Sequence, residues 1–167
     1  VFGKEDTIVT IQIDMLLAQK FGMEYTDADG QKKTPYIIHR TSLGCYERTL
    51  AYLIERYAGA LPLWMMPTQV MVMPITDRAH EYAKELAGKL NAVNIHAETD
   101  CRSEKLGYKI REAQLQKIPY MLVIGDRDME AGTVSVRTRK GEDLGAMTPD
   151  QFIAKCLMEI ATKSKEV

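Results

Sequence analysis

The sequence lacks the features of a membrane protein, a disulfide-stabilised protein or a zinc ribbon. Its three cysteines are odd in number and widely spaced, and no C-x-x-C occurs among the 167 residues. No apolar run approaches the ~20 residues of a membrane-spanning helix, and no basic segment followed by an apolar one is visible at the N-terminus. We therefore expect a reduced, cytoplasmic protein that has no membrane partner. The chain starts at Val1 and not at Met, which favours truncation over processing.

An excess of positive charge is also missing, as are the common catalytic motifs. Lys and Arg number 22 and Asp and Glu 23, so the net charge is −1, which excludes a globally basic nucleic-acid coat but not a local basic face. The sequence contains no G-x-x-x-x-G-K-[ST], G-x-G-x-x-G, G-x-S-x-G or H-E-x-x-H. Phosphate-loop, dinucleotide-binding, nucleophile-elbow hydrolase and zincin functions are therefore unsupported.

The first 60 residues predict several strands followed by one helix. Residues 9–14 alternate apolar and polar, which is typical of a half-buried strand. The turn signal at 27–30 separates segments 23–25 and 36–39, which we interpret as two strands of a hairpin-like unit. Apolar residues recur with helical spacing over 46–57. This segment is too short to close a core of its own, so we expect it to be the end of a larger domain.

The remaining hundred residues predict a separate α/β domain. Pro62, Trp64 and Pro67 mark the boundary between domains at 1–62 and 67–167. Strands are expected at 69–73, 94–99, 120–124 and 133–137. Helices are expected after a Thr76 cap, at 104–117 and after the capping box at 148–151, and a turn is expected at 125–132. This order predicts a mixed sheet with flanking helices, preceded by the antiparallel fragment.

Three neighbouring residues in the N-terminal part have chemical alternatives. His39, at a strand end, is either a metal ligand or a hydrogen-bonded structural histidine. Arg48, early in the helix and off its apolar face, either meets a phosphate or nucleobase or pairs with a glutamate on a solvated face. Cys45 is either a nucleophile or a small residue at the helix start.

Basic residues gather in the C-terminal part. Residues 101–140 contain nine Lys or Arg against five Asp or Glu, the pattern of either an anion-binding face or an ordinary solvated surface. Tyr108 and Tyr120 are candidates for stacking on bases, and Asp128 for accepting a hydrogen bond from a base amino group.

Two long stretches resemble one family. Residues 38–48, IHRTSLGCYER, are similar to the third signature motif of class II aminoacyl-tRNA synthetases in its threonyl version. Residues 104–126 and 132–145 resemble the anticodon-binding domain of threonyl-tRNA synthetases. The likeness covers nearly the whole chain from about Thr10.

The resemblance implies roles for residues of the N-terminal part. His39 matches one of three protein ligands of a zinc ion that holds threonine and rejects valine, so the zinc site within this chain is incomplete. Arg48 matches an arginine that contacts ATP, and Thr10 and Gln12 match residues near threonine and its adenylate. Cys45 stands in the ATP-binding motif, where Ser is common. The full-length enzyme would use ATP with Mg²⁺ and threonine, and would be a homodimer.

In the C-terminal part the resemblance implies recognition of tRNA. Arg111, Asp128 and Arg137 match positions near the anticodon bases, with Ser103 and Lys109 as further candidates. We therefore expect a piece of a threonine–tRNA ligase that binds threonine isoacceptor tRNAs and is inactive by itself. The alternative is a non-catalytic protein that reuses the synthetase anticodon-binding fold as an RNA-binding or regulatory module.

Overall fold

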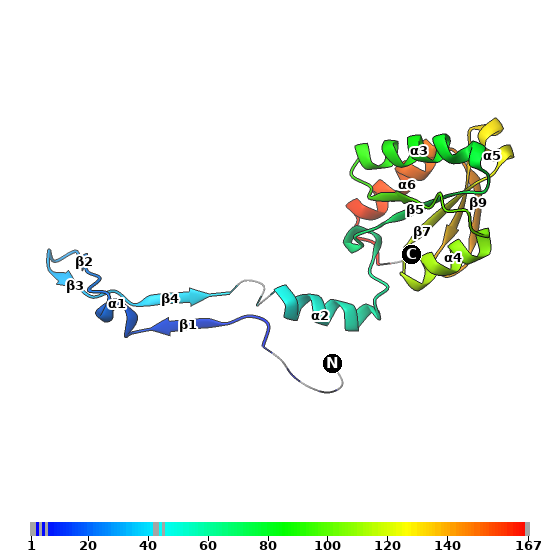
Figure 1. Ribbon diagram of the computed structural model, residues 1–167. Coiled ribbons are helices and arrows are strands. Elements are labelled where there is room, and N and C mark those ends of the chain that lie inside the picture. The colour runs from blue at the N-terminus through cyan, green and yellow to red at the C-terminus, as the bar shows by residue number, and fades with distance from the viewer. Residues whose placement is uncertain (1–2, 4, 6, 42–43, 45, 166–167) are drawn as a thin grey trace. The chain divides into compact units, whose positions relative to one another are not determined.

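The computed structural model describes residues 3, 5, 7–41, 44 and 46–165. The chain divides into two compact units, Val1–Tyr57 and Ala58–Val167, which we call the N-terminal unit and the C-terminal unit. Figure 1 labels the helices and strands of both. None of the helices in the described ranges is long and apolar enough to cross a membrane.

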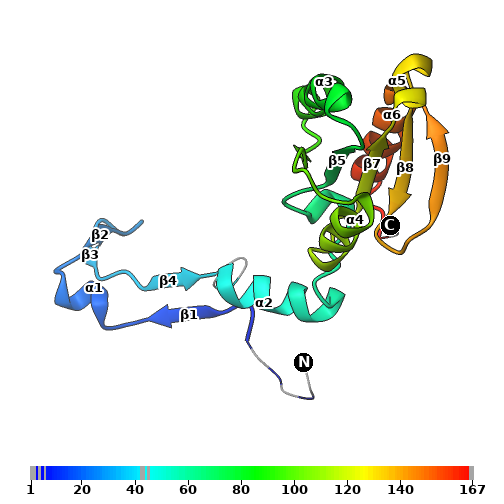
Figure 2. The same cartoon turned by 45° about the vertical axis from the view of Figure 1, so that its right-hand side comes forward.

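The C-terminal unit is built on a five-stranded mixed sheet in the order β6-β5-β7-β8-β9 (Figure 2). Strand β5 is parallel to both β6 and β7, whereas β8 is antiparallel to its neighbours β7 and β9. The strands are β5 (Val70–Pro74), β6 (Ala97–Thr99), β7 (Tyr120–Ile124), β8 (Val134–Thr138) and β9 (Asp143–Met147).

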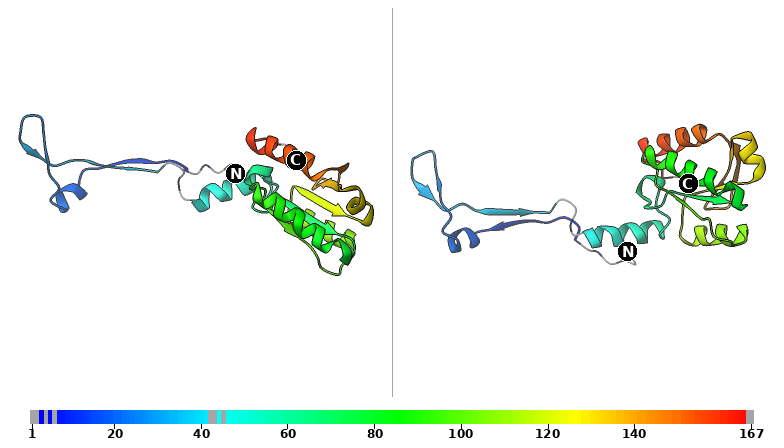
Figure 3. Two further views of the ribbon diagram at one scale, coloured as in Figure 1. Left: turned by 90° about the horizontal axis from the view of Figure 1, so that it is seen from above. Right: turned by 45° about the horizontal axis from the view of Figure 1, so that its top comes forward.

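Helices cover both faces of this sheet. Helices α3 (His80–Ala92) and α6 (Pro149–Ala161) pack on one face and α4 (Leu106–Leu115) on the other (Figure 3). A short helix, α5 (Asp126–Ala131), links β7 to β8, and single 3₁₀ turns occupy Leu63–Met65 and Asp77–Ala79. Each parallel strand pair is thus joined through a helix, as a parallel connection requires.

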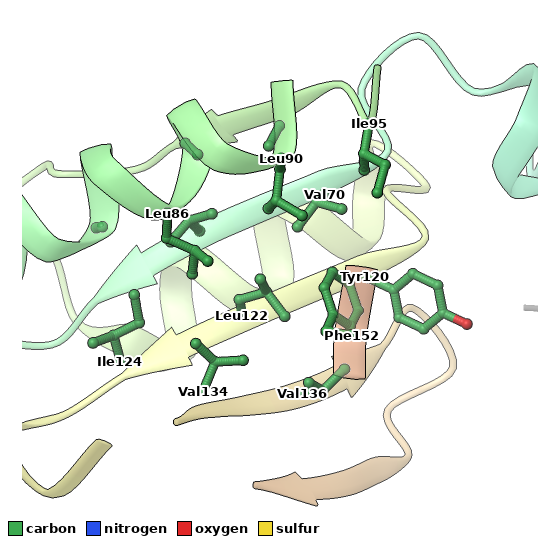
Figure 4. Close-up of a cluster of buried hydrophobic side chains, with 14 of the residues drawn as sticks. Val70, Leu86, Leu90, Ile95, Tyr120, Leu122, Ile124, Val134, Val136 and Phe152 are labelled. Atoms are coloured by element: carbon green, nitrogen blue, oxygen red, sulfur yellow. The ribbon is translucent and has the colours of Figure 1, made fainter. Parts of the chain in front are cut away.

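The core of the C-terminal unit lies mainly between the sheet and helices α3 and α6. Alternate strand residues point into it, and Figure 4 shows Leu122 and Val136 among them. On the other face, Met73 and Met121 pack against Ala113 of α4. Strand β7 is buried at all five positions because both faces are covered, which confirms the central strand expected at 120–124.

The N-terminal unit is two short antiparallel pairs and a helix. Strand β1 (Ile11–Asp14) pairs with β4 (Ile37–Arg40), and β2 (Tyr25–Thr26) pairs with β3 (Lys32–Lys33). The helices are α1 (Leu17–Lys20) and α2 (Tyr46–Tyr57). Among the described residues of this unit only Ala18 is buried, so it has no core of its own.

The expected mixed α/β sheet with flanking helices and an antiparallel fragment is confirmed, with four local corrections. Segments 23–25 and 36–39 do not pair with each other, because β4 pairs with β1. Residues 126–131 form a helix within the expected turn; it ends where Gly132 adopts φ 65°. The exposed edge strand β9 was not predicted, since it lacks an apolar alternation.

The fourth correction concerns the two helix caps. The Thr76 side chain does not cap the helix that follows; its hydroxyl donates instead to Asp126 Oδ1, 3.1 Å away. The capping box at Thr148 is confirmed, with Gln151 N–H donating to the Thr148 hydroxyl and Thr148 N–H donating to the Gln151 side chain.

Candidate nucleic-acid interface

One strip of helix α4 faces strand β8. Gly107, Arg111 and Gln114 follow one another at i, i+4 and i+7, so they share one side of the helix. The Gln114 side-chain amide donates to the backbone carbonyl of Arg139, just beyond the end of β8, at 3.3 Å. This bond places one side of α4 next to the end of β8, and Arg111 lies on that same side of the helix.

The facing residues of β8 are Ser135 and Arg137. They alternate with Val134 and Val136, which are in the core on the α3 and α6 side, so they lie on the α4 side of the sheet. Helix α4 and strand β8 both run opposite to β7, and hence run in the same direction. Because Gln114 meets Arg139, we infer that Arg111, one helical turn earlier, lies on the side of α4 nearest to Arg137, two residues earlier in β8. We call Arg111, Gln114, Ser135 and Arg137 the α4–β8 surface.

Acidic groups hold two of the side chains at this surface. Arg137 Nη2 lies 3.0 Å from Asp143 Oδ2, in an ion pair that is about half exposed. Asp128 accepts hydrogen bonds from the Ser135 hydroxyl at 3.2 Å, from Gly125 N–H at 2.9 Å and from the Thr133 hydroxyl at 3.5 Å. The carboxylate of Asp128 therefore caps α5 while lying next to the surface, with lone-pair capacity left for one more donor.

Ser103 and Lys109 have different surroundings. Ser103 is exposed and lines a hollow of about 270 Å³ at the carboxyl end of β5, which Lys109 also lines. Lys109 itself is 4% exposed, and its ammonium donates to the carbonyls of Asp100 at 2.9 Å and Pro74 at 3.4 Å. This burial gives Lys109 an internal role that ties α4 to β5, and does not favour a direct contact with RNA.

Two further residues of segment 101–140, Arg102 and Tyr120, are hydrogen-bonded to carboxylates of this unit. Arg102 donates to both carboxylate oxygens of Asp100, at 2.9 and 2.7 Å, and also pairs with Glu112. The Arg102 guanidinium lowers the pKa of Asp100. Tyr120 is buried and its hydroxyl donates to Glu159, so the interpretation of Tyr120 as a base-stacking residue is wrong. Tyr108 is about half exposed.

The β1–β4 pair in the N-terminal unit has one polar and one apolar face. Gln12 lies directly opposite His39 in the register, and Thr10 pairs with Thr41, whose hydroxyl accepts from Thr10 N–H at 2.9 Å. The other face carries Ile11, Ile13 and Ile38, each about two-thirds exposed. The structure thus brings Thr10, Gln12 and His39 to one face of a two-stranded ribbon.

His39 is the one imidazole on this polar face. Its Nε2 lies 3.8 Å from Asp14 Oδ2, while Asp14 Oδ1 accepts from the backbone N–H groups of Leu17 and Leu16 at 2.8 Å. These backbone bonds, Leu17 first, lower the pKa of Asp14. No cluster of three His, Cys, Asp or Glu residues that could hold a metal occurs in the ranges that the structure describes. His39 can therefore supply one imidazole ligand, but not a complete metal site.

The chain just before α2 lies against the segment that precedes β1. A Cβ on Gly44 would lie 2.2 Å from the carbonyl oxygen of Ile8, and Gly44 has φ +67°, so only glycine fits there. Arg48 Nη1 donates to the carbonyl of Thr7, which places this arginine near the β1 end of the ribbon. Cys45 lies outside the described residues.

Comparison with known proteins accounts for both units. Residues 69–159 match the anticodon binding domain family, and residues 1–57 match the class II tRNA synthetase core domain of the G, H, P, S and T type. The chain belongs to the anticodon-binding domain family. Its order, the end of a class II core followed by an anticodon-binding domain, confirms the resemblance to the C-terminal part of threonyl-tRNA synthetases.

Individual relatives support the same assignment. The chain is 55% identical to a threonine–tRNA ligase of Clostridium perfringens over 98% of its length, and 53% identical to one of Clostridium botulinum over 99%. It spans about a quarter of those relatives, 25% and 26% respectively. A crystal structure of the RNA binding domain of threonyl-tRNA synthetase from Cryptosporidium parvum is 34% identical, with TM-score 0.77 over 94% of this chain and 40% of that one.

Sequence reasoning about this anticodon-binding domain missed two residues of the α4–β8 surface. Ser135 and Gln114 lie beside Arg137 and Arg111, and Ser135 binds Asp128. The alternation of valines with polar residues at 135 and 137 carried the signal for an open sheet face. Nothing in the sequence indicated that this side of α4 would lie next to β8.

Proposed function

We propose that the C-terminal unit binds the anticodon arm of threonine isoacceptor tRNAs through the α4–β8 surface. The observation that supports this proposal is the hydrogen bond from Gln114 of α4 to the Arg139 carbonyl, from which we infer that Arg111 and Arg137 lie on the same side of the sheet. Two guanidinium groups on one face suit unpaired bases, because each can donate two parallel hydrogen bonds to a base edge or stack on its plane.

The neighbouring groups would add selectivity. Asp128 has lone pairs for the amino group of a base and is held in place by Ser135 and Gly125. Ser103, exposed just before α4, would add a hydroxyl near the end of that helix opposite to Gln114. Lys109 would act indirectly, by fixing α4 on β5.

We also propose that the N-terminal unit belongs to the catalytic site of a cytoplasmic threonine–tRNA ligase. That enzyme activates threonine with ATP and Mg²⁺ and then esterifies it to tRNA. Arg48 would meet the ATP phosphates by charge-assisted hydrogen bonds, with Cys45 nearby in the same motif. Thr10 and Gln12 would lie along the threonine and its adenylate, because they share the polar face of the ribbon with His39.

The zinc ion that this family implies would take His39 as one of its ligands. The single imidazole on the polar face fits that part, and the other ligands would come from residues outside this chain. When bound, zinc supplies a positive centre for the amino and hydroxyl groups of threonine, which rejects valine. Pairing of two such chains into a homodimer would be a property of the whole enzyme.

The test of the anticodon proposal is binding of stem–loop RNA to the 167-residue chain. Fluorescence anisotropy would compare a stem–loop carrying a threonine anticodon with one whose three anticodon bases are replaced. Arg137→Ala and Arg111→Ala should each weaken binding of the first RNA by ~1–3 kcal/mol and reduce the discrimination between the two. Lys89→Ala, on the helix that covers the opposite face, is the control and should bind both RNAs like the wild type. Equal affinity for the two loops would refute the proposal.

A further inference from the structure

A basic hollow lies at the end of the α4–β8 surface. It has a volume of about 280 Å³, and four of the six residues that line it are cationic while none is acidic. The lining residues are Ala60, Gln114, Lys117, Arg139, Lys140 and Lys165. Gln114 belongs to both the surface and the hollow, so the two are continuous.

The cations of the hollow differ from three basic residues elsewhere in this unit. Arg102, Arg137 and Lys155 are each held by a carboxylate. Within the described part of the chain, no carboxylate forms an ion pair with Lys117, Arg139, Lys140 or Lys165. Arg139 is half-buried and the three lysines are exposed, so among the described residues four positive charges surround the hollow without a carboxylate partner.

Arg139 is the half-buried cation among these four. Its Nη1 donates to the carbonyls of Leu61 at 2.6 Å and Lys117 at 3.4 Å, and among the described residues these neutral carbonyls are the hydrogen-bond acceptors of its guanidinium. Burial lowers the pKa of Arg139 because it disfavours the charged form. A bound anion would offset that effect.

The backbone around the hollow is fixed. The N–H of Arg139 donates to the Pro119 carbonyl at 3.0 Å, and that of Gly141 to the Thr138 carbonyl at 3.0 Å. At the end of α4, Lys117 has φ +61° and its N–H donates to the Gln114 carbonyl at 3.0 Å. The side chains of Lys117 and Lys140 therefore start from ordered backbone positions near the Arg139 guanidinium.

We propose that this hollow binds a phosphate group of the RNA backbone, next to the bases that the α4–β8 surface reads. This inference rests on the anticodon proposal and adds to it a contact that carries no sequence information. Lysines surround the phosphate as point charges and Arg139 presents a planar guanidinium, a combination suited to phosphate oxygens. An RNA loop that runs from Arg137 toward Arg139 would pass from the α4–β8 surface to the hollow.

The first test measures the salt dependence of RNA binding by the full 167-residue chain. Lys117→Gln, Lys140→Gln and Lys165→Gln would each be compared with the wild type and with Lys89→Gln, a control on the opposite face of the sheet. Each lysine that meets a phosphate should lower the slope of log affinity against log salt by about 0.7, which makes the loss of affinity between about 50 and about 200 mM salt about 2.5-fold smaller.

The second test locates the phosphate. A series of stem–loops would each carry one uncharged methylphosphonate in the loop. One position should weaken binding to the wild type severalfold and have no effect on binding to a variant that carries Lys117→Gln, Lys140→Gln and Lys165→Gln together. If no position behaves in this way, the hollow does not hold a backbone phosphate.

Two controls separate this inference from the function it rests on. The lysine variants should keep the wild-type ratio of affinities for the two anticodon loops, whereas Arg137→Ala changes that ratio. Normal discrimination with unchanged salt slopes in all three lysine variants would overturn the hollow alone; loss of discrimination in the wild type itself would overturn both. Inorganic phosphate that competes at constant ionic strength, with no methylphosphonate effect, would identify a small-anion site and also overturn the RNA contact.

Discussion

The two units of this chain have a similar density of apolar residues but bury them very differently. In the C-terminal unit, Leu122, Val136 and Phe152 have no exposed surface, and two clusters fill both faces of the sheet. In the N-terminal unit Ile11, Ile13 and Ile38 of the ribbon are about two-thirds exposed, and no residue of α2 is buried. Amphipathic patterning alone therefore does not make a core; the pattern needs a second layer to pack against.

The strongest way to break this comparison is to express the units separately. Residues 58–167 should give a dispersed NMR spectrum and a cooperative thermal transition, because their core is complete. Residues 1–57 should show neither, because burial of one alanine cannot offset the conformational entropy of ordering the chain. A cooperative transition in the 1–57 fragment would contradict the distinction drawn between the units.

Matched alanine substitutions, one in each unit, sharpen the comparison between a buried and an exposed side chain. Leu122→Ala should destabilise the C-terminal unit by about 2–5 kcal/mol, since it removes a fully buried side chain and leaves a cavity. Ile38→Ala, at a side chain that is 67% exposed, should change the same transition by less than about 0.5 kcal/mol. Urea unfolding followed by fluorescence of Trp64, which belongs to the C-terminal unit, measures both. Similar effects from the two substitutions would be evidence against the difference in burial between the two units.

Alkaline pH should act on the C-terminal unit through two buried groups. Burial raises the pKa of the Cys156 thiol from 9.0 to about 12 and that of the Tyr120 hydroxyl from 10.0 to about 12. The unfolded chain therefore releases these protons first, and stability present below pH about 9 is lost as the pH rises toward 12, by at most about 1.4 kcal/mol per pH unit for each group.

The urea midpoint of the C-terminal unit at pH 8 and pH 10.5 measures this loss. Cys156→Ala should reduce the drop between the two pH values, because it removes the thiol that titrates first. The resolved shifts in the N-terminal unit fall on exposed groups and give no comparable alkaline loss. A midpoint that does not fall between the two pH values would count against the burial of these groups.

The smallest expected effect compares two helix caps. Thr148→Ala removes a cap from α6, whose Phe152 and Cys156 are in the core, and should cost about 1 kcal/mol, or about 4–8 °C in the melting temperature of the C-terminal unit. Asp14→Ala removes the equivalent acceptor from α1 but should leave that melting temperature unchanged. An equal shift from both would show that the two units unfold together.

How much could be foreseen depended on how local each feature is. The strand at 120–124, the Thr148 capping box and the helix at 46–57 follow from neighbouring residues, and all three are present. Strand β9 and helix α5 were missed because short, polar elements acquire their form from the partners they meet. The same holds for Thr76, whose hydroxyl binds Asp126 fifty residues later in the chain.

The candidate site shows the same difference between features that depend on neighbouring residues and features that depend on distant ones. The sequence by itself determined which residue types are available, since Arg111, Arg137, His39 and Arg48 stand in stretches distinctive enough to indicate their family. Only the tertiary structure decided which of them share a surface. It buried Lys109 and Tyr120, joined Gln114 of α4 to the end of β8, and left four cations around one hollow. The physical reason is that periodicity fixes the side of an element on which a residue lies, while the neighbours on that side depend on strand order and helix direction.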